Sequence, residues 1–284
     1  MENMSVRAFN APLNPLYDFV ARHPRLFVLT GAGISTDSGI PCYRDTDGNR
    51  TGRAPILIKD FLGSEYARKR YWARSMVGWP IVAQSAPNAA HAALARLEKR
   101  SVLSRLVTQN VDGLHARAGS RDVVELHGNI GHVRCMACGN ETLRAALQTT
   151  LVADNPSFAG LSALAVADGD AQLEENFAGF RVPPCVQCGG LLKPDVVFFG
   201  ESVPRARVDA AAQALEQADA MLVLGSSLMV YSGFRFCEWA ARSGKPIAAV
   251  NLGRTRADAL LDLKVEAPCG AALSLLVDEL DRTG

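Results

Sequence analysis

Four cysteines in this sequence stand in two matched pairs. Cys135 and Cys138 form one Cys-x-x-Cys pair, Cys185 and Cys188 form the other, and a glycine follows each pair. Two thiolates at the tip of each tight turn can close a tetrahedron of four sulfurs around Zn²⁺, a structural site with no open position. A redox dithiol or an iron–sulfur site is the alternative. Between the pairs, the acidic, glycine-containing stretch 168–175 is predicted to be an exposed loop.

A glycine-rich run follows an apolar segment near the start of the chain. The segment LFVLT at 26–30 has the composition of a strand and ends at Gly31, Ala32 and Gly33. Glycines there let backbone N–H groups approach a pyrophosphate at a helix N-terminus. The next glycine, Gly39, comes six residues after Gly33, which departs from the hydride-transfer fingerprint. A plain strand-to-helix turn is the alternative.

Polar side chains follow other apolar segments in the same way. Gln109, Asn110 and Asp112 come after one of them, and an amide beside an acid suits a ligand with a carboxamide-bearing ring. His127 ends another apolar segment and precedes a glycine, which allows the histidine to point into a cleft. A histidine with a purely structural role is the alternative. Two further segments end in small or polar residues that suit an adenosine: Gly225, Ser226, Ser227, Asn251, Leu252 and Gly253.

These residues need a scaffold in which strand ends meet. The strands are predicted at 26–30, 103–108, 123–126, 221–225 and 247–251. Helical patterns lie between them at 89–100, 205–217 and 234–242. Strands alternating with helices predict an α/β fold with a doubly wound parallel, Rossmann-like sheet, whose carboxyl edge binds the ligand.

Two stretches interrupt this alternation. They are 45–85, rich in charged and aromatic residues, and 131–193, which holds both cysteine pairs. We expect them to form a smaller inserted domain that contains a four-cysteine zinc ribbon. The remaining segments, 1–44, 86–130 and 194–284, are expected to form the Rossmann-like nucleotide-binding domain.

Composition limits the partners and the compartment. The chain has 284 residues, 48% of them apolar, and 30 basic against 29 acidic side chains give a formal charge of +1. No global field therefore draws it to nucleic acid or an anionic membrane. Residues 1–12 lack the apolar core of a secretory signal, so we expect a reducing cytosol, where Cys42, Cys237 and Cys269 are small buried side chains.

The ordered motifs are similar to those of one known family. The segments GAGISTDSGIPCYR, TQNVDGLH, ELHG, the two cysteine pairs, KPDVVFFGE, GSS and VNLG occur in the order and spacing of the sirtuins, NAD-dependent protein deacylases. The resemblance runs from about residue 13 to residue 269. Within it, RYWARSMVGWP, CVQCGGLLKPDVVFFGE and SLMVYSGFRF look most like class II and its sirtuin-4 group, in which Tyr replacing Phe at position 43 is familiar.

The resemblance implies roles for individual residues. Asn110 and Asp112 would grip the nicotinamide amide, and His127 would take a proton from a ribose hydroxyl. Val197, Phe198, Phe199 and Gly200 would pair with an extended acyl-lysine peptide, opposite 228–232. The implied NAD contacts are the following: Gly31, Ala32, Gly33, Thr36, Asp37, Tyr43, Arg44, Gln109, Asn110, Asp112, Gly225, Ser226, Ser227, Asn251, Leu252, Gly253 and Cys269.

The implied reaction consumes NAD and yields free lysine, nicotinamide and an acylated ADP-ribose. Transfer of ADP-ribose to protein side chains, which uses the same activated sugar, is the first alternative. A non-catalytic NAD-sensing or zinc-ribbon binding module is the second. The presence of Asn110, Asp112 and His127 argues against the second, because a module without turnover is expected to lack one of them.

Tyr71 and Arg74 stand three residues apart, a spacing that puts both on one face of a helix. From spacing alone, a solvated helix face with one anchored aromatic is the favoured interpretation. The resemblance to class II sirtuins instead implies that this pair receives a distal carboxylate on the acyl group. We therefore expect acidic or branched acyl-lysines, such as glutaryl and hydroxymethylglutaryl, to be preferred over acetyl-lysine, with lipoyl-like chains as a second class.

Overall fold

A computed structural model describes residues 14–51, 55–161, 165–166, 170–171, 173 and 175–283. The whole amino-terminal segment considered as a signal, residues 1–12, and residues 168, 169, 172 and 174 of the expected loop lie outside these ranges. No helix among the described residues is both long and apolar enough to cross a membrane.

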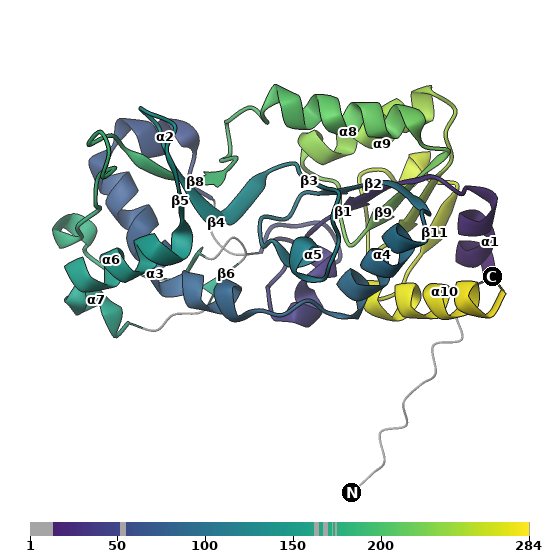
Figure 1. Ribbon diagram of the computed structural model, residues 1–284, viewed down its shortest axis with the longest axis horizontal. Helices are drawn as coiled ribbons and strands as arrows, with labels where there is room; N and C mark the ends of the chain where they lie inside the picture. Colours follow the sequence, from purple (N-terminus) through teal and green to yellow (C-terminus); the bar gives the residue numbers. More distant parts are fainter. Residues whose placement is uncertain are drawn as a thin grey trace, which may run out of the picture.

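A six-stranded parallel sheet forms the larger part of the molecule (Figure 1). Its strands are β1 (Leu26–Thr30), β2 (Leu103–Thr108), β3 (Val123–Glu125), β9 (Ala220–Leu224), β10 (Ile247–Val250) and β11 (Leu263–Val265). They lie in the order β11-β10-β9-β1-β2-β3, so the chain builds one half outward from β1 and then returns to β9. The boundary between β1 and β9 is the topological switch point, where ligands of such sheets bind. All five predicted strands are confirmed, and β11 is the one that was missed.

Helices cover both faces of this sheet, which confirms the doubly wound fold (Figure 1). One face carries α1 (Asn14–Arg22), α4 (Ala89–Lys99) and α10 (Cys269–Thr283), and the other carries α8 (Arg205–Gln217) and α9 (Tyr231–Arg242). In β1, Val28 packs on the first face while Phe27 and Leu29 pack on the second. Because successive strand side chains point to opposite faces, burial on both sides requires the continuous apolar runs seen in the sequence.

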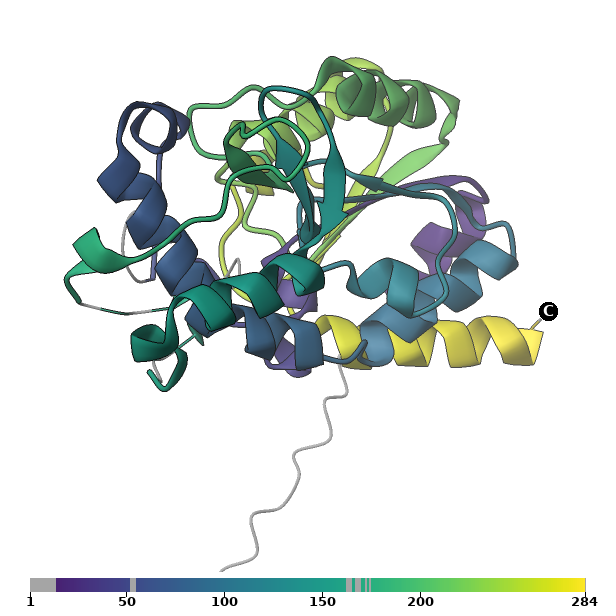
Figure 2. The ribbon, with the colours of Figure 1, turned by 60° about the vertical axis from the view of Figure 1, so that its left-hand side comes forward.

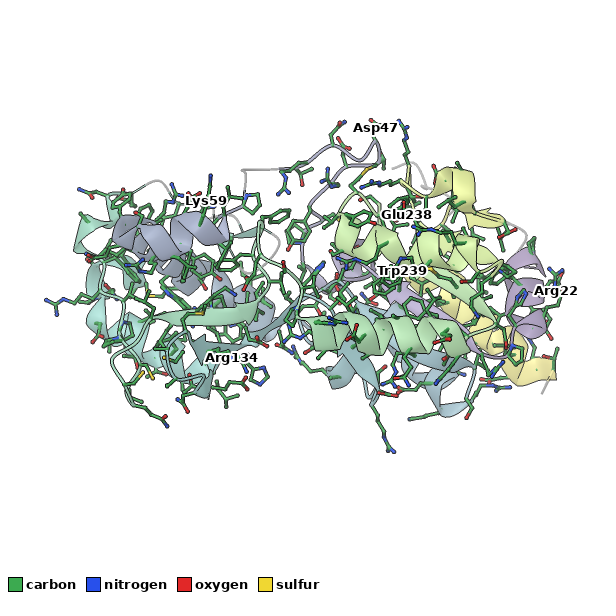
Figure 3. The ribbon with its side chains drawn as sticks, turned by 90° about the horizontal axis from the view of Figure 1, so that it is seen from above. Arg22, Asp47, Lys59, Arg134, Glu238 and Trp239 are labelled. Carbon is green, nitrogen blue, oxygen red and sulfur yellow. The ribbon has the colours of Figure 1, made fainter. Side chains whose placement is uncertain are left out.

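The second module has its own sheet and core. Its antiparallel sheet has the order β5-β4-β8, from β4 (Gly128–Cys135), β5 (Glu141–Leu143) and β8 (Leu192–Val196). Its helices are α2 (Ile58–Gly63), α3 (Glu65–Gln84), α6 (Arg144–Asp154) and α7 (Pro156–Ala159), and β6 (Ala165–Val166) pairs with β7 (Asp170–Ala171). Figure 3 shows this module, with Lys59 and Arg134, beside the lobe that carries Arg22 and Trp239. The expected domain boundaries at 130/131 and 193/194 fall inside β4 and β8, so that division stays a prediction.

Helix α3 positions one wall of the site. It begins after Ser64, whose hydroxyl accepts a hydrogen bond from the Ala67 N–H at 3.2 Å. The negative charge of Glu65 in the first turn interacts favourably with the helix dipole. Pro80 inside the helix has no N–H to donate to the Met76 carbonyl. Gln148 of α6 donates to that carbonyl instead, at 2.8 Å. This bond helps to tie α3 to α6, and Figure 2 shows α3 in blue and α6 in teal.

Candidate active site

The backbone at the switch point is packed too tightly for side chains. The Gly33 N–H donates to the Gly225 carbonyl at 2.8 Å, and a Cβ on Gly33 would lie 2.8 Å from the same oxygen. A Cβ on Gly31 would lie 2.7 Å from the Ser226 Cβ. The glycines after β1 and β9 therefore allow the two strand ends to meet and leave backbone uncovered by side chains, as a phosphate site requires.

One cleft of about 890 Å³ extends from these glycines to the second module. Most of the predicted site residues line it: Gly31, Ala32, Gly33, Thr36, Asp37, Tyr43, Arg44, Tyr71, Arg74, Gln109, Asn110, His127, Val197, Phe198, Phe199, Gly200, Gly225, Ser226, Ser227, Asn251, Leu252 and Cys269. Two of the residues predicted to contact NAD do not. Gly253 packs against the Thr46 backbone, and Asp112 lines a smaller pocket beside the cleft. Most of the predicted site residues thus line the cleft, although they make up less than half of its lining.

Asn110 and Asp112 are joined by a residue that the sequence reasoning missed. The Asn110 amide donates to the Ser35 hydroxyl at 3.0 Å, and this hydroxyl donates to Asp112 at 2.7 Å. The other Asp112 oxygen accepts the Leu114 N–H at 2.9 Å. These bonds fix the amide and the acid on the wall of the side pocket. The position of Ser35 directly after the glycine turn is the signal that could have identified it.

His127 enters the cleft from the end of β3. The chain turns at Gly128, where φ is 90° and a Cβ would lie 2.0 Å from the Asp195 carbonyl oxygen. The imidazole Nδ1 lies 2.8 Å from the Gln109 carbonyl, and Nε2 lies 2.7 Å from the Ser232 hydroxyl. Since a carbonyl can only accept, Nδ1 carries the proton and the lone pair of the neutral ring is on Nε2. Ser232 was expected near the peptide and not as a partner of His127.

The charge state of His127 follows from its surroundings. Burial lowers the pKa of His127 below its ordinary value of 6.5. The hydrogen bond to the Gln109 carbonyl opposes this shift, and the positive charges of Arg235 and Arg207 add to it. The imidazole is therefore neutral at pH 7, with Nε2 ready to accept a proton.

Tyr71 and Arg74 lie together on α3 at the far end of the cleft, not on a solvated helix face. The Tyr71 ring packs edge-on against Phe61 and Trp72, with centroid distances of 5.6 and 5.3 Å. The Arg74 side chain is only 12% exposed and forms a salt bridge of 2.5 Å with Asp170.

The expectation of an exposed loop at 168–175 is wrong for several of its described residues. Ala171 and Leu173 are buried, and Asp170 contacts α3 through Arg74. The acidic composition suggested solvent, but Asp170 has a guanidinium partner and its neighbours are apolar.

Arg144 is a further cation that the sequence reasoning missed. Its side chain is fully buried behind Ser75, to which it donates, and its guanidinium lies over the rings of Trp72 and Trp79. Its Nε and Nη1 have no hydrogen-bond partner among the described residues. Burial lowers the pKa of Arg144 to about 10, which still leaves it charged at pH 7. A buried positive charge therefore lies behind Ser75, which lines the far end of the cleft.

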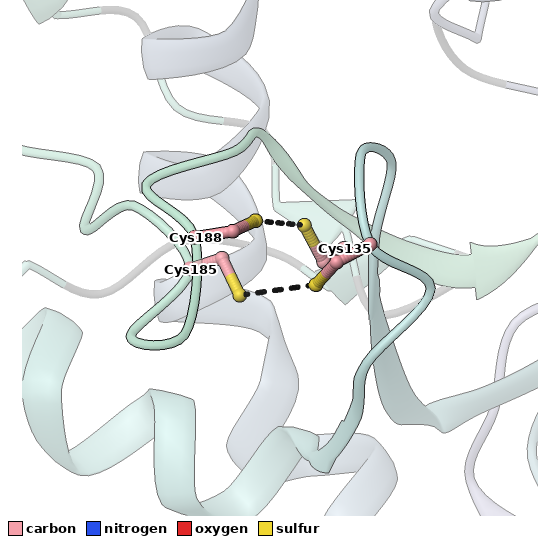
Figure 4. Close-up of side chains that lie close together, drawn as sticks. Cys135, Cys185 and Cys188 are labelled. Carbon is pink, nitrogen blue, oxygen red and sulfur yellow. Dashed lines mark hydrogen bonds between the residues drawn. The ribbon is translucent and has the colours of Figure 1, made fainter.

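The four paired cysteines meet at one point, with their sulfurs all within 4.8 Å of one another. Figure 4 shows Cys135 facing Cys188. The Cys135 and Cys188 sulfurs are 3.5 Å apart, and the Cys138 and Cys185 sulfurs are 3.8 Å apart. Zn–S bonds of about 2.3 Å in a tetrahedron place sulfurs about 3.8 Å apart, so these residues fit zinc. The predicted structural zinc site is supported.

The remaining cysteines only partly match their expectation. Cys237 and Cys269 are buried, as expected, and burial raises the pKa of each thiol to about 12. Cys42 is half-buried and lines the cleft, because it stands in the loop between the glycine turn and Tyr43.

Comparisons with known proteins agree with this geometry. The model of the Sir2 family matches residues 31–232. The chain is 58% identical over 271 residues to NAD-dependent protein deacetylase 2 of Bradyrhizobium diazoefficiens, covering 94% of this chain and 99% of that one. It is also 58% identical over 262 residues to NAD-dependent protein deacetylase of Xanthomonas axonopodis pv. citri, covering 92% and 89%.

Solved structures give the same result. A structure described as Sir2 with a p53 peptide and NAD⁺ matches with a TM-score of 0.74 at 29% identity, covering 96% of this chain and all of that chain. A Sir2 homologue in complex with NAD matches with a TM-score of 0.73 at 30% identity, covering 95% and 94%. The resemblance seen in the sequence is thus confirmed at the level of the family. The chain belongs to the Sir2 family.

Proposed function

We propose that this protein is an NAD-dependent protein-lysine deacylase that releases nicotinamide and O-acyl-ADP-ribose. The observation that carries the proposal is a single cleft in which His127 lies with both the nucleotide loops and the Tyr71–Arg74 wall. The relatives named NAD-dependent protein deacetylases, which match almost the full chain, support the same activity. A cofactor-binding module without turnover does not require this combination.

The residues around the switch point fit NAD. Gly31 and Gly33, which line the cleft without side chains, would bind the pyrophosphate through their backbone, and Asn251 and Cys269 line the part where adenosine would lie. Bound NAD supplies a ribose carbon that becomes electrophilic when nicotinamide leaves. Asn110 and Asp112, held through Ser35, would bind the nicotinamide amide in the side pocket.

His127 is proposed as the general base. Its Nδ1–H is held by the Gln109 carbonyl, so Nε2 faces the cleft in the position to receive a proton from a ribose hydroxyl. The Ser232 hydroxyl now bonded to Nε2 marks the place that a substrate hydroxyl would take. The lowered pKa keeps this nitrogen unprotonated at neutral pH.

The peptide is proposed to pair with residues 197–200. One edge of this segment is already used, because Phe199 pairs with Leu57 and its carbonyl accepts the Ile58 N–H at 3.0 Å. An extended acyl-lysine peptide would therefore add to the opposite edge, between this segment and 228–232. Its lysine side chain would then point toward His127 and the Tyr71–Arg74 wall.

We further propose that acidic or branched acyl groups are preferred and that the chain belongs to the sirtuin-4-like branch of class II. Arg70, Tyr71 and Arg74 all line the far end of the cleft, and buried Arg144 lies behind it. A guanidinium can bind a distal carboxylate with two parallel hydrogen bonds, and a phenol can add a third. Acetyl-lysine has no distal carboxylate to accept from these donors.

The acyl preference is tested by kcat/KM for one lysine peptide carrying acetyl, glutaryl or hydroxymethylglutaryl groups. The acidic acyl groups should be processed better than acetyl, and Arg74→Ala should lower kcat/KM roughly 10-fold or more for them alone, the usual worth of a charged hydrogen bond. An equal loss on all peptides, or a preference for acetyl throughout, would rule Arg74 out as the receptor.

The deacylase activity itself is tested by following the peptide by mass spectrometry. Acetyl-lysine should be converted to free lysine only when NAD is present, with nicotinamide appearing at the same rate. Conversion without NAD would contradict the assigned activity.

We also infer that the protein works in a reducing cytosol, which keeps the four zinc-site thiols reduced. The two-domain division predicted from the sequence is proposed as well.

A further inference from the structure

Asp170 lies where a substrate carboxylate is expected. It is on β7 and lines the far end of the cleft together with Arg70, Tyr71 and Arg74. Its Oδ2 accepts a hydrogen bond from Arg74 Nη2 at 2.5 Å. The Arg74 Nε–H donates to the neighbouring Ala171 carbonyl at 2.9 Å. Two donors on one edge of the guanidinium are thus already bound to this chain.

Asp170 and the Ala171 carbonyl occupy the two donors of Arg74 that a carboxylate ligand would use. Nε and one Nη are the two donors of a guanidinium that commonly bind a carboxylate side by side. Here a carboxylate oxygen takes one and a backbone oxygen takes the other. The Asp170 side chain is 31% exposed and lines the cleft, so a ligand can reach it.

We infer that Asp170 is a specificity-determining residue, which competes with the distal carboxylate of an acidic acyl group for Arg74. The inference rests on the proposed acyl receptor and adds a second member to it. An acidic acyl group must displace Asp170 from Arg74 or accept only the donors that remain, while a neutral acyl group has no need of Arg74. Asp170 therefore lowers the efficiency for acidic acyl groups relative to neutral ones.

The balance of charges makes this exchange feasible. Burial raises the pKa of Asp170, and the attraction to Arg74 opposes that shift without cancelling it. The contacts with Arg74 therefore do not fully offset the cost of burying the ionised Asp170 carboxylate. When Asp170 leaves, an incoming carboxylate restores the same charge beside Arg74, so no guanidinium is left unpaired.

The test compares wild type with Asp170→Asn, which keeps the shape and removes the charge. Three acyl groups are placed on one lysine peptide: glutaryl, its uncharged carboxamide analogue, and acetyl. The ratio of kcat/KM for glutaryl to that for the carboxamide should rise roughly 5- to 30-fold, the worth of one partly buried charged hydrogen bond. Glu175→Gln removes an exposed charge nearby in the chain and should leave the ratio unchanged.

The double variant Asp170→Asn/Arg74→Ala separates this inference from the proposed receptor. If Arg74→Ala lowers the ratio but Asp170→Asn does not raise it, the receptor stands and the competition is refuted. If Arg74→Ala leaves the ratio unchanged, the receptor itself is wrong. A rise in all three substrates alike would show that Asp170→Asn only opens the cleft, which also overturns the inference. Competition predicts that the gain from Asp170→Asn disappears in the double variant.

Discussion

His91 and His115 are buried against each other beneath the nucleotide loop, with ring centroids 4.8 Å apart. His115 is 2% exposed, and its Nε2 lies 2.9 Å from the Thr30 hydroxyl at the end of β1. Burial, with a smaller contribution from His91, lowers the pKa of His115 to about 3. The fold therefore accepts only the neutral ring at physiological pH.

This makes stability depend on pH in a definite direction. The unfolded chain takes up a proton near pH 6.5, whereas the folded chain resists protonation until about pH 3. The contribution of His115 is therefore complete above pH 6.5 and is lost progressively as the pH falls toward 3. Each pH unit below 6.5 costs about 1.4 kcal/mol, so at pH 5 the loss is about 2 kcal/mol.

The assay is urea unfolding followed by tryptophan fluorescence at pH 8 and at pH 5, in wild type and in His115→Gln, whose amide does not titrate. The difference in the free energy of unfolding between the two pH values should be about 2 kcal/mol smaller in the variant. Titrating groups that do not contact His115, and any zinc release at pH 5, act on both proteins and cancel. Equal differences in the two proteins, or an NMR titration of His115 near pH 6.5, would refute the reasoning.

Three further predictions concern the base and the zinc site. His127→Ala should retain NAD binding by calorimetry and lose turnover by roughly 10²- to 10⁴-fold, the range for a positioned acid–base group, and near-normal turnover would remove it from that role. The acid limb of kcat/KM should lie below pH 6.5, and Arg235→Gln should move it to higher pH, because a positive charge that lowers the pKa of His127 is gone. The Cys185→Ala variant should lose zinc and melt at a lower temperature than wild type. A strong chelator should have the same effect on wild type. A stable variant with full zinc content would contradict the assignment of the four cysteines as ligands.

The sequence was most informative where function depends on local backbone pattern. The apolar segment LFVLT and the glycines after it predict the switch point, because short apolar runs and glycine turns are local features of a sequence. The contacts that were missed join distant parts of the chain: Asp170 meets Arg74 96 residues earlier, and Ser232 meets His127. Such pairs follow from the packing of elements that are distant in sequence but belong to one module, α3 with β7 and the end of β3 with α9, which no local pattern encodes. The exposure of Asp170 was predicted wrongly for the same reason. The acidic composition of the stretch 168–175 suggested contact with solvent, and the sequence gives no sign that Arg74 is its partner.

The most direct test of the proposed activity is a mass spectrum of one reaction containing the protein, NAD and an acyl-lysine peptide. NAD-dependent deacylation through the His127 site predicts equal amounts of nicotinamide, free-lysine peptide and acylated ADP-ribose. ADP-ribose attached to protein, with the peptide still acylated, would instead support transfer to side chains. Nicotinamide released at the same rate without the peptide would contradict the coupling of the nucleotide loops to the acyl end of the cleft.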